Sequence, residues 1–181
     1  DLKTERLELR VLKPTPENAE LVWNAIKDEN PDDFKYIWYT MSGKSHVPDS
    51  LDETKQLMKR DFDFDNGCTY YVFRNDKFIG YMRIHYWKDS NTLQCASVWF
   101  IKTERNKGFN KEIHDKLEDL AFNGLHVNRM CRQTMAGNTE SKNSIEHSGY
   151  HLDGIDRQAN RMPDGTYMDH LLFSKLASEY K

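Results

Sequence analysis

The fold is decided by residues 92–122, which read TLQCASVWFI (92–101), KTERNKGFN (102–110) and KEIHDKLEDLAF (111–122). The first block is an apolar run typical of a buried strand, and the third has the spacing of an amphipathic helix. The basic loop between them contains a glycine. This order directs the unpaired amides of the first helical turn, and the positive end of the helix dipole, at an anion. The segment therefore predicts a phosphate or pyrophosphate site at residues 105–110.

Four stretches of the chain match known motifs in a fixed order. RNKGFN (105–110) follows the pattern R/Q-x-x-G-x-G/A, and NTESKNSIEHSGY (138–150) follows N-x-x-S-x-x-x-x-x-x-x-G-F/Y. TERLELR (4–10) and DGTYMDHLL (164–172) are similar to the first strand and the last hairpin of the same proteins. Together they resemble the GNAT (GCN5-related N-acetyltransferase) superfamily and, within it, the RimJ/RimL-type branch. The resemblance spans nearly the whole chain.

At two positions this chain differs from the residues that many GNAT proteins have. Asn110 replaces the second loop glycine. If that position needs a positive φ, we expect strain of about 1–3 kcal/mol and weaker coenzyme binding. Seven residues after Asn138, where many GNAT enzymes have a tyrosine acid, stands Ile145, as in the RimJ/RimL branch. The resemblance therefore leaves Ser141 as the proton donor.

The resemblance implies an α+β fold with a mixed, mostly antiparallel sheet of about seven strands, flanked by helices and splayed between the fourth and fifth strands. Those strands would be residues 93–101 and 129–135. It also implies acetyl-CoA as cosubstrate. No metal is expected, because the seven histidines show no metal-ligand spacing. The main-chain N–H of Phe100 would polarise the thioester carbonyl and hold the oxygen of the tetrahedral intermediate, a contact worth roughly 2.7–4 kcal/mol. Ser141 would protonate the departing thiolate.

The residues implied as acetyl-CoA ligands are Trp99, Phe100, Ile101, Arg105, Asn106, Lys107, Gly108, Phe109, Asn110, Asn138, Ser141 and Asn143. Several have a simpler interpretation. The charges of Arg105 and Lys107 could be merely solvated, and Ser141 could be an ordinary residue of a helix start that Asn138 caps. The side chain of Trp99 is expected in the core, and His114 on the exposed face of its helix.

The acceptor side is predicted from FKYIWY (34–39), which falls where GNAT proteins build the acceptor wall. An aromatic face could stack a flat group such as a nucleobase. The residues expected to bind the acceptor are Trp38, Tyr39, Arg83 and His85. Arg83 and His85 share one face of a strand, which either borders the acceptor groove or is a solvated sheet edge.

The general base is not identified by the sequence, although Asp32, Asp33 and Asp89 are candidates. Making a lysine amine neutral at pH 7 costs about 3 kcal/mol more than making an α-amine neutral. A site without an obvious strong base therefore suits α-amines, with water carrying the proton away.

Two acceptors stay open. RimJ/RimL-type enzymes acetylate the N-terminal α-amines of ribosomal proteins, whereas microcin C self-immunity acetyltransferases modify the α-amine of a toxic aminoacyl-nucleotide, an antibiotic-resistance function. Polyamines and aminoglycosides are disfavoured because no acidic cluster marks a polycation site. The alternative from another class is an inert CoA-binding module with the same fold, which Asn110 favours and Ser141 opposes.

Length and composition predict the number of domains, the kinds of binding partner and the state of the cysteines. The 181 residues predict one domain, residues 1–181, and the missing initial methionine leaves open whether it is cut from a longer chain. A net charge of −3 argues against binding to duplex nucleic acid. No apolar run approaches the ~18 residues of a membrane span. Three cysteines without a C-x-x-C motif predict reduced thiols in a cytoplasmic protein, with Cys95 and Cys131 in the core, and a monomer or a homodimer is expected.

Overall fold

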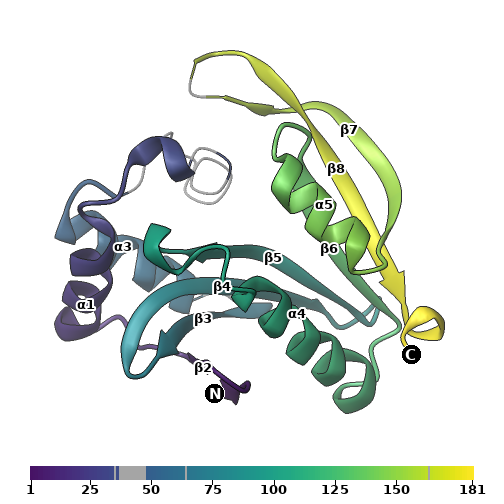
Figure 1. Ribbon diagram of the computed structural model, residues 1–181, viewed down its shortest axis with the longest axis horizontal. Coiled ribbons are helices and arrows are strands. Elements are labelled where there is room, and N and C mark those ends of the chain that lie inside the picture. The colour runs from purple at the N-terminus through teal and green to yellow at the C-terminus, as the bar shows by residue number, and fades with distance from the viewer. Residues whose placement is uncertain (35, 37–47, 64, 163) are drawn as a thin grey trace.

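The structure is a computed structural model that describes residues 1–34, 36, 48–63, 65–162 and 164–181 (Figure 1). Its sheet has eight strands in the order β1-β2-β3-β4-β5-β6-β8-β7 and is antiparallel except between β5 and β6. The predicted α+β fold with a mixed, mostly antiparallel sheet is therefore confirmed. The sheet exceeds the expected seven strands because Leu2–Lys3 pairs with the strand that follows it.

The strands are β1 (Leu2–Lys3), β2 (Glu8–Arg10), β3 (Gly67–Arg74), β4 (Lys77–Trp87), β5 (Thr92–Phe100), β6 (Arg129–Met135), β7 (His151–Arg161) and β8 (Tyr167–Leu176). The α-helices among the described residues are α1 (Pro16–Ile26), α3 (Leu51–Phe62), α4 (Phe109–Asp119) and α5 (Thr139–His147). Short helical turns are η1 (Pro31–Phe34), η2 (Lys102–Glu104), η3 (Leu120–Gly124) and η4 (Ala177–Glu179). None of the described helices combines the length and apolarity needed to cross a membrane.

Three of the helices begin at capping side chains. Thr15 accepts a hydrogen bond from the amide of Asn18 at 3.3 Å, and Ser50 accepts one from Glu53 at 3.2 Å. The Asn138 side chain accepts one from the amide of Ser141 at 3.2 Å. Each cap satisfies one of the amides that a helix start leaves unpaired. The predicted cap at Asn138 is confirmed.

The β3–β4 hairpin turns at Asn75 and Asp76, which both have a positive φ (49° and 58°). This conformation matches the twist of the flanking strands and suits Asn and Asp. It places β4 between β3 and β5, in the interior of the sheet. Arg83 is buried there, so the alternative that its face is a solvated sheet edge is wrong.

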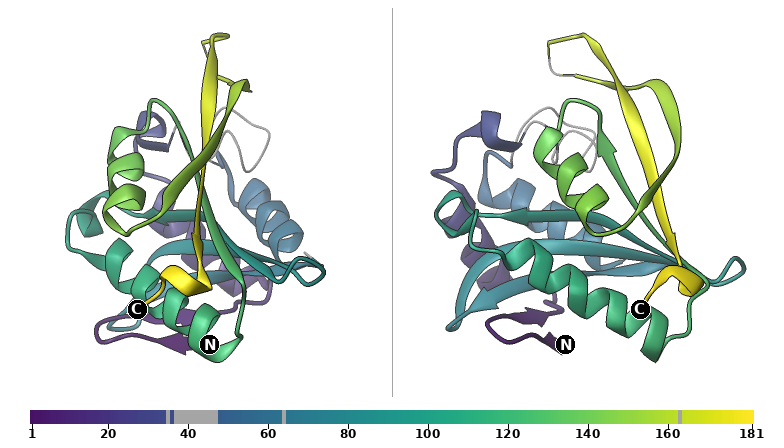
Figure 2. Two further views of the ribbon diagram at one scale, coloured as in Figure 1. Left: turned by 90° about the vertical axis from the view of Figure 1, so that its right-hand side faces the viewer. Right: turned by 45° about the vertical axis from the view of Figure 1, so that its right-hand side comes forward.

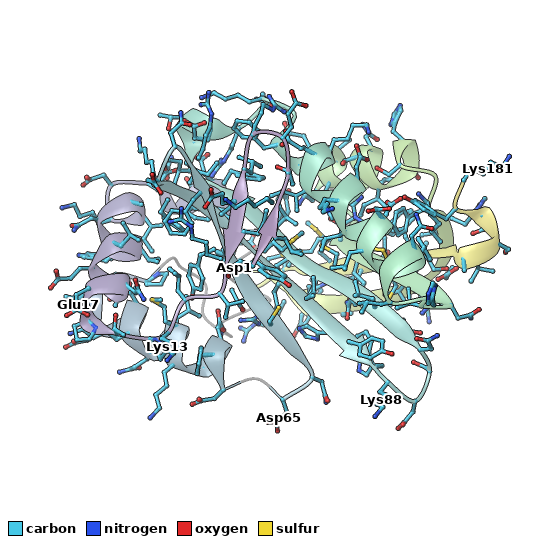
Figure 3. All side chains as sticks on the ribbon, turned by 90° about the horizontal axis from the view of Figure 1, so that it is seen from below. Asp1, Lys13, Glu17, Asp65, Lys88 and Lys181 are labelled. Atoms are coloured by element: carbon cyan, nitrogen blue, oxygen red, sulfur yellow. The ribbon has the colours of Figure 1, made fainter. Side chains whose placement is uncertain are left out.

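The helices cover both faces of the sheet. Seen from the side in the left view of Figure 2, α5 and α3 lie on opposite sides of the strands. Seen from below in Figure 3, Glu17 at the start of α1 and the C-terminal Lys181 lie at opposite ends of the molecule. The side chain of Trp99 is 2% exposed and packs against the rings of Phe78 and Tyr81, as expected of a core residue. Cys95 and Cys131 are also buried in strands, as predicted.

A buried ion pair links α4 to β8, with Glu118 Oε2 2.7 Å from Lys175 Nζ and both side chains about nine-tenths buried. Removing one partner leaves the other charge desolvated and unpaired. We therefore expect Glu118→Gln to lower the free energy of unfolding by about 3–5 kcal/mol, measured by urea denaturation. Asp115→Asn, which breaks the exposed Lys111–Asp115 pair on the same helix, should have little effect. Equal effects of the two substitutions would contradict this view of the pair.

Candidate active site

The two parallel strands of the sheet separate part-way along their length. β5 and β6 pair from Thr92 with Arg129 to Cys95 with Arg132, and no further. Beyond this point a cleft of about 1480 Å³ opens between them. The predicted splay between these strands is therefore confirmed, and we call the last pair, Cys95 and Arg132, the vertex of the cleft.

The amide of Phe100 points into this opening. The next residue, Ile101, donates its N–H to the carbonyl of Ile79 on β4 at 2.9 Å. Because successive amides of a strand point to opposite edges, the N–H of Phe100 is directed away from β4, towards the gap that β6 has left. The Phe100 carbonyl points the same way and accepts a hydrogen bond from Arg105 Nε at 2.9 Å. A donor fixed by the sheet in this way is suited to hold a carbonyl oxygen.

The loop before α4 has the geometry of an anion site. Asn106 and Gly108 both adopt a positive φ, 60° and 80°, and Gly108 directly precedes the first helical residue. Within the described ranges, the amides of residues 106–111 donate to no other group of the protein. Unpaired amides before and within the first turn of a helix, together with the positive end of its dipole, are the arrangement that binds phosphate groups at helix starts.

Asn110 lies in the first turn of α4 with a helical backbone. The strain considered from the sequence therefore does not arise, and within this loop the asparagine that takes the left-handed conformation is Asn106. The Asn110 side chain donates to Ser144 Oγ at 3.3 Å, so it connects the start of α4 with α5 across the cleft.

The N-terminal hairpin holds the loop in place. Arg6 Nε lies 2.6 Å from Glu112 Oε2, and Arg6 donates to the carbonyl of Lys107 at 3.1 Å. The guanidinium also lies 4.6 Å from the centre of the Phe109 ring. Burial of Glu112 acts to raise its pKa, but hydrogen bonds from Thr4 and Arg6 outweigh it and the pKa is lowered. The sequence motifs give no role to Arg6, because its partner is more than a hundred residues away.

The basic side chains of the loop have acidic neighbours. The Arg105 guanidinium has Nη atoms 3.9 Å from Glu29 Oε2 and 3.9 Å from Asp33 Oδ2. Lys107 Nζ lies 3.0 Å from Glu104 Oε2. Their charges are thus largely countered within the protein, and the main-chain amides are the clearer ligands for an anion.

Residues on both faces of the sheet line the cleft. Cys95 and Arg132 pair across the vertex and share the face that α4 and α5 cover, because Cys95 Sγ lies 4.0 Å from His114 Nε2 on α4 and Arg132 lies over Tyr150 after α5. We call this the donor face. On β8, which pairs with β6, Phe173 stands opposite Arg132 and His170 opposite Met135. Since residues alternate along a strand, His170 lies on the other face, which we call the acceptor face.

His170 is a cleft residue that sequence reasoning missed. Its Nδ1 lies 2.9 Å from Asn160 Nδ2 on the adjacent strand β7. Its Nε2 is buried and, among the described residues, has no hydrogen-bond partner. Burial lowers the pKa of His170 although Asp156 opposes the shift, so the ring is neutral at pH 7. If Asn160 Nδ2 donates to Nδ1, the ring proton lies on Nε2, which can then only donate. If the Asn160 amide is turned so that its oxygen faces Nδ1, the ring proton lies on Nδ1 and Nε2 can accept a proton from the cleft.

His114 corrects another expectation. It is buried, with 2% exposure, because α4 packs this residue against β5 instead of turning it to solvent. Burial, with a contribution from Arg132, holds the pKa of His114 well below its ordinary value. Its Nδ1 has no hydrogen-bond partner in the described part of the chain.

The structure brings most of the predicted site residues to this cleft. The predicted residues that line it are Arg83, His85, Trp99, Phe100, Arg105, Asn106, Gly108, Phe109, Asn110, Asn138 and Ser141. The predicted ligands Ile101, Lys107 and Asn143 are not among its lining residues. Trp38 and Tyr39 lie outside the described residues. Of the candidate bases, Asp32 and Asp33 line the cleft and Asp89 does not.

A sheet opened between two parallel strands, with an anion-binding loop at the end of one of them, defines a class of acyl-CoA-dependent transferases. The chain belongs to the acetyltransferase (GNAT) domain family, whose family model matches residues 6–151. It is therefore an N-acetyltransferase of the kind that takes its acetyl group from acetyl-CoA.

Three known proteins illustrate the similarity. The probable N-acetyltransferase YjcK of Bacillus subtilis (strain 168) is 24% identical over 184 residues, covering 97% of this chain and 96% of its own. The microcin C7 self-immunity acetyltransferase MccE, solved with acetyl-CoA and AMP, is 16% identical with a TM-score of 0.77, covering 95% of this chain and 93% of its own. Spermidine N-acetyltransferase from Vibrio cholerae, solved with CoA and spermine, is 18% identical with a TM-score of 0.75, covering 97% and 98%. The structural likeness establishes the fold, and it does not choose the acceptor.

Proposed function

We propose that this protein transfers the acetyl group of acetyl-CoA to a primary α-amine by direct attack of the amine on the thioester. The observation that carries the proposal is that Phe100, Ser141 and five of the six residues with free amides (106 and 108–111) line one cleft. The loop amides bind the pyrophosphate, as they would any anion at a helix start. The Phe100 amide holds the thioester oxygen as it becomes an oxyanion.

Ser141 and His170 complete the proton transfers. His170 Nε2 takes a proton from the acceptor ammonium, directly or through one water, in the tautomer whose ring proton lies on Nδ1, with the Asn160 side-chain amide turned so that its oxygen accepts that proton. The amine lone pair then attacks the carbonyl carbon. As the C–S bond breaks, the Ser141 hydroxyl donates a proton to the thiolate of CoA and regains one that the attacking nitrogen loses as the amide forms. The C–N bond replaces the C–S bond, and one proton is released for each amide formed.

An α-amine fits the acceptor face better than a polycation does. Asp33 lies 3.4 Å from Lys102 Nζ and 3.9 Å from Arg105 Nη1, so its charge is already countered. A polyamine needs several free carboxylates, whereas an α-amine needs one base and neutral surroundings. The acceptor is therefore a protein N-terminus, such as that of a ribosomal protein, or an aminoacyl-nucleotide like the one that MccE-type self-immunity enzymes act on.

Release of CoA thiol tests the proposal. The acceptors are peptides with a free N-terminus, the same peptides with a blocked N-terminus and one internal lysine, an aminoacyl sulfamoyl-adenosine, and spermidine. We expect release with a free N-terminus or with the aminoacyl analogue, and at least tenfold less with the lysine peptides and spermidine. Measurable CoA binding without release for any acceptor would instead support the inert CoA-binding module.

A further inference from the structure

The guanidinium of Arg132 is buried at the vertex without an anionic partner. The residue is 5% exposed, lines the cleft, and lies 5.4 Å from the centre of the Tyr150 ring. Its Nη1 is buried and makes no hydrogen bond within the part of the chain that the structure describes. A desolvated guanidinium is unfavourable unless an anion or several acceptors surround it. The protein supplies neither, so a ligand is the natural source.

The surrounding side chains do not provide the missing negative charge. Burial raises the pKa of the Cys95 thiol to about 12 and raises the pKa of Tyr150, so both are neutral at pH 7. Glu118 is the one anion nearby among the described residues, and it is paired with Lys175 at 2.7 Å. The cluster therefore holds two cations and one carboxylate.

The position of Arg132 indicates which part of a ligand it meets. It lies on the donor face, which it shares with Cys95 and His114, and α4 on this face begins at the anion-binding loop. That loop follows the C-terminal end of β5, whereas the vertex is near the middle of the strand. A donor with its pyrophosphate on the loop and its thioester at the Phe100 amide directs its acyl chain towards the vertex. An anion at Arg132 is therefore carried by the acyl group.

We propose that Arg132, together with His114, forms a subsite for a carboxylate at the end of the acyl chain, so that the protein also uses dicarboxylic acyl-CoA donors such as succinyl-CoA. This rests on the donor placement in the proposed function. Cys95 Sγ lies 4.0 Å from His114 Nε2, and in the tautomer in which Nε2 accepts from the thiol, Nδ1 carries the ring proton and is a second donor. The bonds made and broken match acetyl transfer: the amine displaces CoA thiol, and the product is an N-acyl amide with a free carboxylate.

Binding of two non-hydrolysable CoA thioethers tests the subsite without requiring any reaction. S-(3-carboxypropyl)-CoA carries the terminal carboxylate, and S-butyl-CoA is its uncharged counterpart. In calorimetry, we expect the wild-type protein to bind the carboxylate thioether at least tenfold more tightly. Arg132→Met should abolish this preference and leave the affinity for S-butyl-CoA within threefold. Arg129→Met, which removes an exposed arginine of the same strand that pairs with Asp153, should retain the preference.

Two results would overturn the subsite. One is equal affinity of the wild-type protein for the two thioethers. The other is an equal loss of both affinities in Arg132→Met, which would place the guanidinium on the shared part of the coenzyme.

With an active acceptor, the wild-type kcat/KM for succinyl-CoA should lie within tenfold of that for acetyl-CoA, and Arg132→Met should lower only the kcat/KM for succinyl-CoA, by about 100-fold. A thioether preference without any acyl transfer would leave the subsite standing and refute the proposed function.

Discussion

Ser141→Ala is expected to lower kcat by about 10²-fold or more while the Kd of acetyl-CoA stays within threefold. A general acid placed at a leaving group contributes about 10²–10⁴-fold to the rate, because the thiolate otherwise leaves without a proton. Ser141 lies in the first turn of α5, where its amide donates to the capping side chain of Asn138, so its backbone contact survives the substitution. Steady-state kinetics and calorimetry on the same preparation separate the effect on turnover from the effect on binding.

Ser148→Ala is the matched control. Ser148 directly follows the last residue of the same helix and is not among the residues that line the cleft, and its hydroxyl donates to the carbonyl of Ser144 at 2.8 Å. We expect it to keep near wild-type turnover. If Ser141→Ala retains full kcat with a saturating acceptor, the serine is an ordinary residue of the helix start and the thiolate is protonated by another group.

His170→Gln is expected to lower kcat/KM for the acceptor by about 10²-fold or more, because glutamine can hydrogen-bond to Asn160 but cannot take a proton. His170 acts only when neutral, and its pKa is lowered from the ordinary 6.5, chiefly by burial. The groups that face it are Asp156 and Asn160 on β7 and Met135 on β6. The wild-type kcat/KM should therefore decline only at a pH below 6.5, where the ring becomes protonated.

The pH profile separates a catalytic role from a structural one. In His170→Gln the acid limb due to this group should disappear, leaving a low rate that depends only on the ionisation of the acceptor amine. His151→Gln, which replaces an exposed histidine on β7 near Glu179, should keep both rate and profile. An unchanged acid limb in His170→Gln would remove this histidine from the mechanism, whatever the size of the rate loss.

The donor half of the site could be predicted from the sequence because it depends on local order along the chain. A strand, a glycine loop and a helix that follow one another within 31 residues place their amides with little freedom, whatever surrounds them. The cap at Asn138 is local in the same sense. The strain considered at Asn110 does not arise because the helix begins one residue earlier, at Phe109.

The acceptor half and the vertex depend on contacts between distant segments. His170 reaches the cleft because β8 pairs with β6 in one register, and a shift of one residue would turn it to the donor face. The strand that contains Arg132 mixes apolar and polar residues, so its sequence does not indicate that Arg132 is buried. The burial results from the helices that cover this face of the sheet. For His114, the helical pattern alone did not indicate which face α4 turns inward.

Binding of the coenzyme pyrophosphate by the main-chain amides of residues 106–111 underlies every catalytic role described above, and calorimetry with CoA measures it directly. Gly108 has a φ of +80°, a conformation that L side chains rarely adopt, so Gly108→Val must strain or distort the loop although its β carbon would make only an ordinary contact, 3.5 Å from Arg6 Nη2. Gly165→Val imposes the same strain at a φ of +85° in open space on the distant β7–β8 turn. We predict that the wild-type protein and Gly165→Val bind CoA equally, and that Gly108→Val binds it at least tenfold more weakly. Equal CoA affinity in all three proteins, or no binding to the wild type at millimolar CoA, would contradict this role of the amides.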